Sequence, residues 1–128
     1  MASLIKAVTW DCGEPRRVAA FWAAALGTDV DEDSTDERAF VEAAGWGGPN
    51  MWFVKVSEGK TAKNRMHFDL RPPGRMDDEV ERLRALGATE VHRFATHVYL
   101  WGLEGNEFCV ELGPGDENDD RADDAVRS

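Results

Sequence analysis

The 128-residue chain has few cysteines and histidines, fewer basic than acidic residues, and no long hydrophobic run. Its two cysteines, Cys12 and Cys109, lie far apart in strand-like segments, and no charged-then-apolar signal segment opens the sequence. Reduced thiols in a cytoplasmic protein are therefore expected. No stretch approaches the roughly 18 apolar residues that cross a bilayer, so a membrane is not an expected partner.

The shortage of basic residues also argues against nucleic acid as a partner. Lysine and arginine number 15 against 25 acidic residues, which gives a formal net charge of −10, whereas phosphate binding needs basic clusters. The charge permits attraction of cationic ligands. Residues 113–128 hold six acidic residues against two arginines, which gives −4 and leaves −6 for the rest. This segment has almost no apolar residues and is predicted to be a disordered acidic tail.

At 42% hydrophobic and 31% charged residues, the chain can bury a core, and its length fits one domain over residues 1–112. Glycine, proline and the hydrophobic periodicity divide the first half of that domain into one helix and four strands. The strands are predicted over 4–10, 28–33, 38–44 and 51–56, and the helix enters at Gly13-Glu14-Pro15 and ends at Gly27.

The second half repeats this order after a polar linker at 58–64. Its strands are predicted over 65–71, 90–94, 97–101 and 106–112, and its helix over 76–86. Two βαβββ modules, about 4–57 and 64–112, follow from the repeat. The predicted fold is α+β, with the modules forming a curved mixed sheet around a cleft.

Two strands of the second half have a polar face. Because strand side chains alternate, Glu107, Cys109 and Glu111 share one side of the last strand, while Phe108 and Val110 share the other. The strand over 65–71 likewise places Arg65, His67, Asp69 and Arg71 together. These faces are the first candidates for a site. In the strand over 97–101 either His97, Tyr99 and Trp101 or Val98 and Leu100 face the cleft, and the alternation cannot choose between them.

Three motifs resemble the vicinal oxygen chelate superfamily, in its glyoxalase-like and bleomycin-resistance-like branches. The run 21–27 (FWAAALG) resembles the aromatic pair and Leu-Gly that end the family's first helix. The run 64–70 (NRMHFDL) resembles the strand that opens the second module, and 103–109 (LEGNEFC) resembles the family's final turn and strand. Gly102 and Leu103 replace the Asp-Pro of that turn.

The resemblance implies where metal-dependent members hold their ion, with His, Gln or Glu at four positions. Carried over, these positions are Ala7, Val54, His67 and Cys109. Alanine and valine cannot donate to a metal, and two remaining ligands are too few for a tight catalytic site. No cofactor is therefore expected. If a divalent metal is present, it is held by His67 and Cys109, with a nearby carboxylate such as Asp11, Asp69, Glu107 or Glu111.

Cys109 is also a candidate nucleophile activated by His67, but the flanking Glu107 and Glu111 would raise its thiol pKa, and a strand cysteine is usually a packing residue. Five tryptophans are a high number for this length. Trp10 and Trp22 are expected in the core, Trp46 at a glycine-rich rim, and Trp52 in the cleft. The aromatic residues either bind a flat or cationic ligand or only pack between modules or subunits.

The leading functional hypothesis is metal-independent binding of a small aromatic or cationic organic molecule, as in resistance proteins that sequester drugs. The alternative is a metal-dependent lyase, isomerase or dioxygenase, and a module that acts only with a partner protein is a third possibility. A homodimer is expected. The predicted ligand-binding residues are His67, Asp69, Trp52, Glu107, Cys109, Tyr99 and Trp101.

Overall fold

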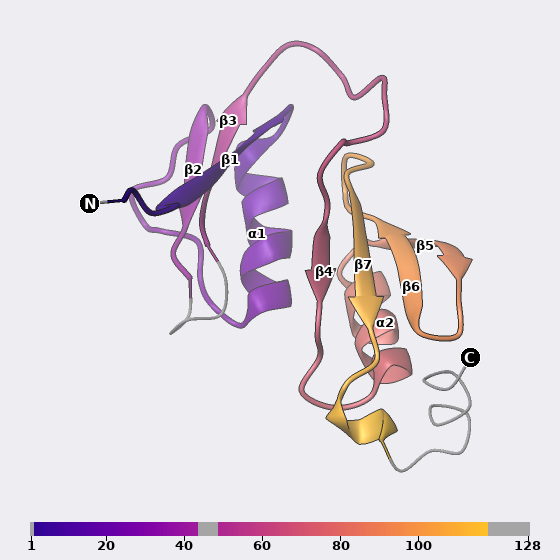
Figure 1. Ribbon diagram of the computed structural model, residues 1–128. Coiled ribbons are helices and arrows are strands. Elements are labelled where there is room, and N and C mark those ends of the chain that lie inside the picture. Colours follow the sequence, from indigo (N-terminus) through magenta and orange to yellow (C-terminus); the bar gives the residue numbers. More distant parts are fainter. Residues whose placement is uncertain (1, 44–48, 118–128) are drawn as a thin grey trace. The chain divides into compact units, whose positions relative to one another are not determined.

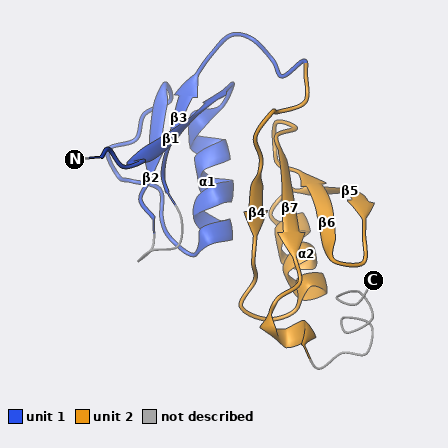
Figure 2. Cartoon of the chain, viewed as in Figure 1, with its two compact units in different colours: residues 1–61 blue, residues 62–128 orange. Residues whose placement is uncertain are grey.

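The computed structural model describes residues 2–43 and 49–117 (Figure 1). The chain divides into two compact units, residues 1–61 (unit 1) and 62–128 (unit 2), shown in different colours in Figure 2. The division falls inside the segment 58–64 that the sequence predicts to be a linker. Trp46 and most of the predicted acidic tail lie outside the described residues.

Unit 1 is a three-stranded mixed sheet covered by one helix. Strand β1 (Ala7–Cys12) runs parallel to the central strand β3 (Asn50–Lys55), and β2 (Arg38–Val41) pairs antiparallel with the other side of β3. Helix α1 (Pro15–Leu26) connects β1 to the rest. It begins with proline in the first turn and ends at Gly27, whose left-handed φ of 73° suits glycine.

The core of unit 1 lies between α1 and its sheet. Trp22, Met51 and Phe53 are almost fully buried, and the ring of Trp10 stacks on Phe53 and lies tilted against Trp22. The first strand begins later than predicted, because Leu4 and Ile5 lie outside the sheet and are highly exposed.

The prediction of a strand over residues 28–33 is wrong, because the described structure has no strand there. Only an isolated antiparallel bridge, Val30 to Val41, forms there. The backbone N–H of Asp33 donates to the side chain of Asp31, a local bond that turns the chain. Aspartates that bond their own backbone disfavour an extended strand, which explains the difference.

Unit 2 is a four-stranded mixed sheet in the order β4-β7-β6-β5. Strand β4 runs parallel to β7, and the other two pairs are antiparallel. A 3₁₀ turn, η1, follows the last strand. The elements are β4 (Phe68–Leu70), α2 (Met76–Ala85), β5 (Thr89–Arg93), β6 (His97–Trp101), β7 (Glu107–Glu111) and η1 (Pro114–Asp116).

Helix α2 covers one face of this sheet and fixes which side chains form the core. Val80 and Leu83 of the helix are fully buried. The fully buried strand residues are Val98, Leu100, Phe108 and Val110. Val98 and Leu100 therefore belong to the core. Tyr99 and Trp101 point to the opposite side of the sheet, so of the two sets that the sequence offers for β6, Val98 and Leu100 are the one that packs in the core.

Residues 113–117 include the 3₁₀ turn η1, although the sequence predicts that the tail begins at residue 113. Asp116 of η1 is 2% exposed, and its carboxylate accepts hydrogen bonds from the backbone N–H groups of Met76 (2.9 Å) and Gly113 (3.0 Å). Met76 opens α2, so Asp116 caps that helix from a distant part of the sequence. The prediction that the tail begins at residue 113 is therefore wrong for residues 113–117.

The α+β fold class is confirmed, with two small mixed sheets and two helices. Among the described residues, no helix has the length and apolar character needed to cross a membrane.

Candidate functional site

The candidate site lies on the face of the unit 2 sheet that points away from α2, called here the distal face. Strand β7 is central, and Cys109 pairs with Asp69 of β4 on one side and with Tyr99 of β6 on the other. Paired residues of neighbouring strands point to the same side of a sheet. The register therefore brings three predicted ligand-binding residues together on the distal face.

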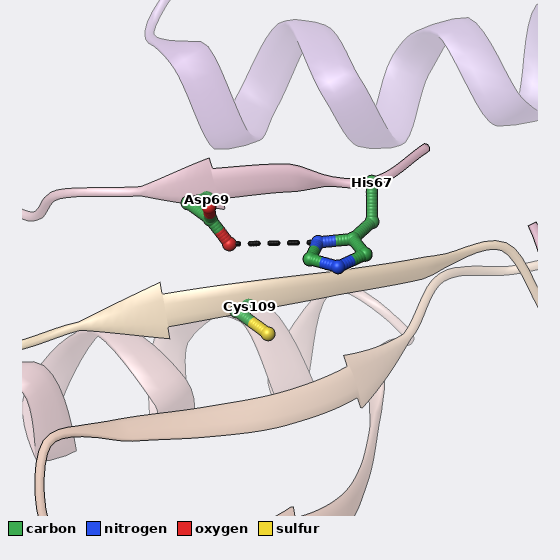
Figure 3. A group of neighbouring side chains, drawn as sticks. All are labelled: His67, Asp69 and Cys109. Carbon is green, nitrogen blue, oxygen red and sulfur yellow. Dashed lines mark ion pairs between the residues drawn. The ribbon is translucent and has the colours of Figure 1, made fainter. Parts of the chain in front are cut away.

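His67 joins them from the segment just before β4, which is shorter than the predicted strand over 65–71. One ligand atom from each of His67, Asp69 and Cys109 lies within 4.8 Å of the others, and Figure 3 shows the three side chains together over β4 and β7. Nδ1 of His67 is 3.5 Å from Oδ1 of Asp69. The histidine and aspartate side chains are 39% and 62% exposed, whereas Cys109 is buried.

The surroundings of Cys109 favour the protonated form of its thiol. Burial raises its pKa, and the nearby carboxylate of Asp69 raises it further, while Lys63 acts in the opposite direction. The sequence predicts a raised pKa from Glu107 and Glu111, but the carboxylate responsible is that of Asp69. A protonated thiol is a poor nucleophile, so this environment does not favour nucleophilic catalysis by Cys109.

Lys63 is a residue of the distal face that the sequence reading misses. Its ammonium lies 5.8 Å from the ring centroid of Tyr99. No local pattern in the sequence points to it, because residues 61–67 form no strand and the alternation of strand side chains does not apply there.

Glu107, a predicted ligand-binding residue, forms a hydrogen bond with the linker segment 58–64. It is 4% exposed, and its carboxylate accepts the backbone N–H of Asn64 at 2.9 Å. This bond holds the residue next to Lys63 against the start of β7. The contact gives Glu107 a positioning role on the distal face.

Trp101 and Trp52 complete the predicted set. Trp101, opposite Glu107 in the register, is 44% exposed on the distal face. Trp52 belongs to unit 1, where Phe40 contacts its ring at 4.6 Å between centroids and the guanidinium of Arg38 lies 4.9 Å from it. Six of the seven predicted residues therefore belong to unit 2 and one to unit 1.

The four metal positions implied by the resemblance are not all filled by donors. Ala7 and Val54 offer only hydrocarbon side chains, and both are half-buried in the unit 1 sheet. His67 and Cys109 are near each other in unit 2, and Asp69 adds a carboxylate beside them. The chain thus lacks the four-position set but carries three donors of mixed type, a number that a metal site can use.

The match to a family model settles the family. The model of the glyoxalase-like domain matches residues 7–111. The chain belongs to the glyoxalase-like domain family. No curated protein matches the sequence significantly.

Solved structures show the same fold at low sequence identity. A glyoxalase/bleomycin resistance protein/dioxygenase family enzyme from Burkholderia phytofirmans is 17% identical at a TM-score of 0.65, covering 84% of this chain and 97% of its own. The oxidase ChaP-H2 is 17% identical at 0.61, covering 89% and 96%. A variant of the fosfomycin resistance protein FosX from Listeria monocytogenes, complexed with Mn(II) and a dihydroxypropylphosphonic acid, is 17% identical at 0.66, covering 87% and 93%.

Proposed function

We propose that this glyoxalase-like protein binds a small planar organic molecule on the distal face of unit 2. The observation that carries the proposal is the row of side chains across β4, β7 and β6, in which polar Asp69 and buried Cys109 lie beside Tyr99. Rings supply stacking area, and a few polar groups orient the ligand. Binding of this kind needs no metal, in line with Ala7 and Val54 at two family positions.

Of the two ligand types expected from the sequence, aromatic compounds are favoured over cations. The Lys63 ammonium already lies near the Tyr99 ring. A cationic ligand would have to displace or approach this like charge, whereas a neutral or anionic aromatic ring would not. The predicted homodimer and cytoplasmic location stay predictions.

The proposal is tested by fluorescence, because Trp101 is the one tryptophan in the sequence of unit 2. Neutral, anionic and cationic aromatic compounds are titrated into the full chain, with a neutral sugar as a negative control. We expect saturable quenching by neutral or anionic rings, lost in Trp101→Phe and weakened at least about tenfold in Tyr99→Ala. No response to any aromatic compound would refute the proposal.

Leu86→Ala is the control, because Leu86 is 37% exposed at the end of α2, which covers the other face of the sheet, and is not one of the predicted ligand-binding residues. It should leave the quenching unchanged. An equal loss in Leu86→Ala and Tyr99→Ala would mean that the effect is not specific to the distal face.

A second candidate function is a metal-dependent lyase, isomerase or dioxygenase. The grouping of His67, Asp69 and Cys109 within 4.8 Å favours it. Metal content of the purified protein, measured before and after dialysis against a chelator, separates this candidate from the first.

A further inference from the structure

The distal face of unit 2 extends beyond the predicted ligand-binding residues to the edge strand β5. His92 of β5 pairs with Tyr99 of β6, and Tyr99 pairs with Cys109 of β7, so these side chains lie on the same side of the sheet. His92 is exposed there. The row that starts at Asp69 and Cys109 therefore continues through Tyr99 to a second planar ring.

The ring of His92 is held in place by aromatic contacts. Its centroid lies 4.4 Å from that of Phe94 in an edge-to-face arrangement, and Phe94 stacks on His97 at 4.5 Å. Neighbouring strands lie about 4.8 Å apart, so Tyr99 and His92 together offer a surface about two rings wide. That width suits a flat, fused-ring molecule.

One positive charge lies beside these rings. The Lys63 ammonium is 5.8 Å from the ring centroid of Tyr99, close to the limit of about 6 Å for a cation–π contact, so the contact is a weak one. Its charge also acts on Cys109, in the middle of the row. Lys63 forms no ion pair with another of the described residues. Its ammonium is therefore available to an anionic group of a ligand.

The backbone next to Lys63 is fixed by two hydrogen bonds. Asn64 donates its backbone N–H to the Glu107 carboxylate at 2.9 Å, and its side-chain amide donates to Oδ1 of Asn106 at 3.4 Å. Glu107 is 4% exposed, so its bond is largely shielded from water. A lysine on a fixed backbone loses less conformational freedom on binding than one on a mobile loop.

We propose that the molecule bound on the distal face is a planar aromatic carboxylic acid, with its ring over Tyr99 and His92 and its carboxylate beside Lys63. This rests on the proposed function and names the chemical class of the ligand. It adds His92 to the residues that bind the ring, and it makes Lys63 the residue that selects an acid over a neutral molecule.

The negative charges of the protein favour an acid with a single charge. Asp69 belongs to β4, two strands away from Tyr99 and thus roughly 10 Å from it, and its carboxylate faces His67 at 3.5 Å. This separation is about one screening length at physiological salt, so Asp69 repels a carboxylate beside Lys63 only weakly. A doubly charged phosphate would leave one charge unpaired on a protein whose net charge is −10.

The test compares three naphthalene compounds that share one ring system: 2-naphthoate, 2-naphthamide and 2-naphthyl phosphate. Their binding to the full chain is measured by equilibrium dialysis near neutral pH, with the fluorescence of the naphthalene ring as the readout. We expect naphthoate to bind about three- to fivefold more tightly than the neutral amide, the effect of one exposed ion pair. It should also bind more tightly than the phosphate. Added salt should reduce the preference for the acid over the amide.

Variants of Lys63 decide whether this residue supplies the preference. Lys63→Gln should bind the acid and the amide equally, and Lys63→Glu should bind the amide more tightly than the acid. The matched control, Lys60→Gln, removes the same charge from the same linker segment and should keep the preference of the wild type. His92→Ala should weaken all three compounds alike, because they share the ring. Circular dichroism checks that each variant is folded.

The outcomes separate this inference from the proposed function. Equal binding of acid and amide by the wild type, with loss of both in Tyr99→Ala, would overturn the choice of an acid and leave ring binding intact. A preference for the acid that survives in Lys63→Gln, or tighter binding of the phosphate than of the carboxylate, would also overturn it. Failure of all three compounds to bind would contradict the proposed function and this inference with it.

Discussion

Units 1 and 2 carry different chemistry at positions that their repeat makes equivalent. A shift of 60 residues sets Ala7 opposite His67, and a shift of 55 sets Val54 opposite Cys109. Both units pair their first strand parallel with a later one and cover one sheet face with a helix. The comparison teaches that the two copies share the arrangement of elements, while donor groups stand at these positions in only one of them.

The two units also differ at the N-terminus of their helix. Asp116 caps α2 through the backbone N–H of Met76, and the first turn of α2 holds three acidic residues. Helix α1 instead begins with Pro15, which has no N–H to satisfy, and its first turn has no acidic residue. Unit 2 therefore depends on a contact distant in sequence where unit 1 depends on its own proline.

The largest expected effect comes from truncating one buried phenylalanine in the core of each unit. Phe108→Ala in unit 2 and Phe53→Ala in unit 1 each remove a fully buried ring, and each should lower the free energy of unfolding by about 3–5 kcal/mol. Urea denaturation measures the loss. If the units unfold together, both variants shift one common transition. A transition that splits in only one variant would show that the units unfold separately.

A smaller effect is expected at the cap of α2. Asp116→Ala removes the acceptor for two buried N–H groups, so the free energy of unfolding should fall by about 1–2 kcal/mol. Asp116→Asn, which keeps one acceptor oxygen, should lose less. Thermal denaturation of the two variants checks the order, and an unchanged stability in Asp116→Ala would refute the capping role.

The smallest effect concerns the Cys109 thiol and the pH dependence of stability. The raised pKa of Cys109 keeps it protonated where an unfolded thiol, with a pKa of about 8.5, begins to ionise. The unfolded state then binds fewer protons, so this group makes stability fall as the pH rises through and above that value. Cys109→Ser should flatten the alkaline decline in melting temperature, and a decline as steep as in the wild type would contradict the shift.

Much of the fold could be predicted because hydrophobic alternation is local. The same pattern that placed Phe108 and Val110 opposite Cys109 in the sequence holds in β7. It failed to choose a face for β6, where Val98 and Leu100 compete with Tyr99 and Trp101, because both sets are apolar. Only the packing of α2 decides between them.

The grouping of the candidate residues follows from the resemblance and not from any local pattern. The resemblance implies that His67 and Cys109 lie together, whereas the parallel register of β4 with β7, which sets Asp69 beside Cys109, is encoded by no local pattern. Lys63 was missed because it precedes the predicted strand, and Asp116 because its partner Met76 lies 40 residues away. Long-range pairing is the common reason.

The most direct test of the claim that the distal face of unit 2 binds a planar organic molecule is the titration of the full chain with aromatic compounds, followed by the fluorescence of Trp101. The account predicts saturable quenching by a neutral or anionic ring that is weakened at least about tenfold in Tyr99→Ala. Quenching of equal strength in the wild type and in Tyr99→Ala would contradict it.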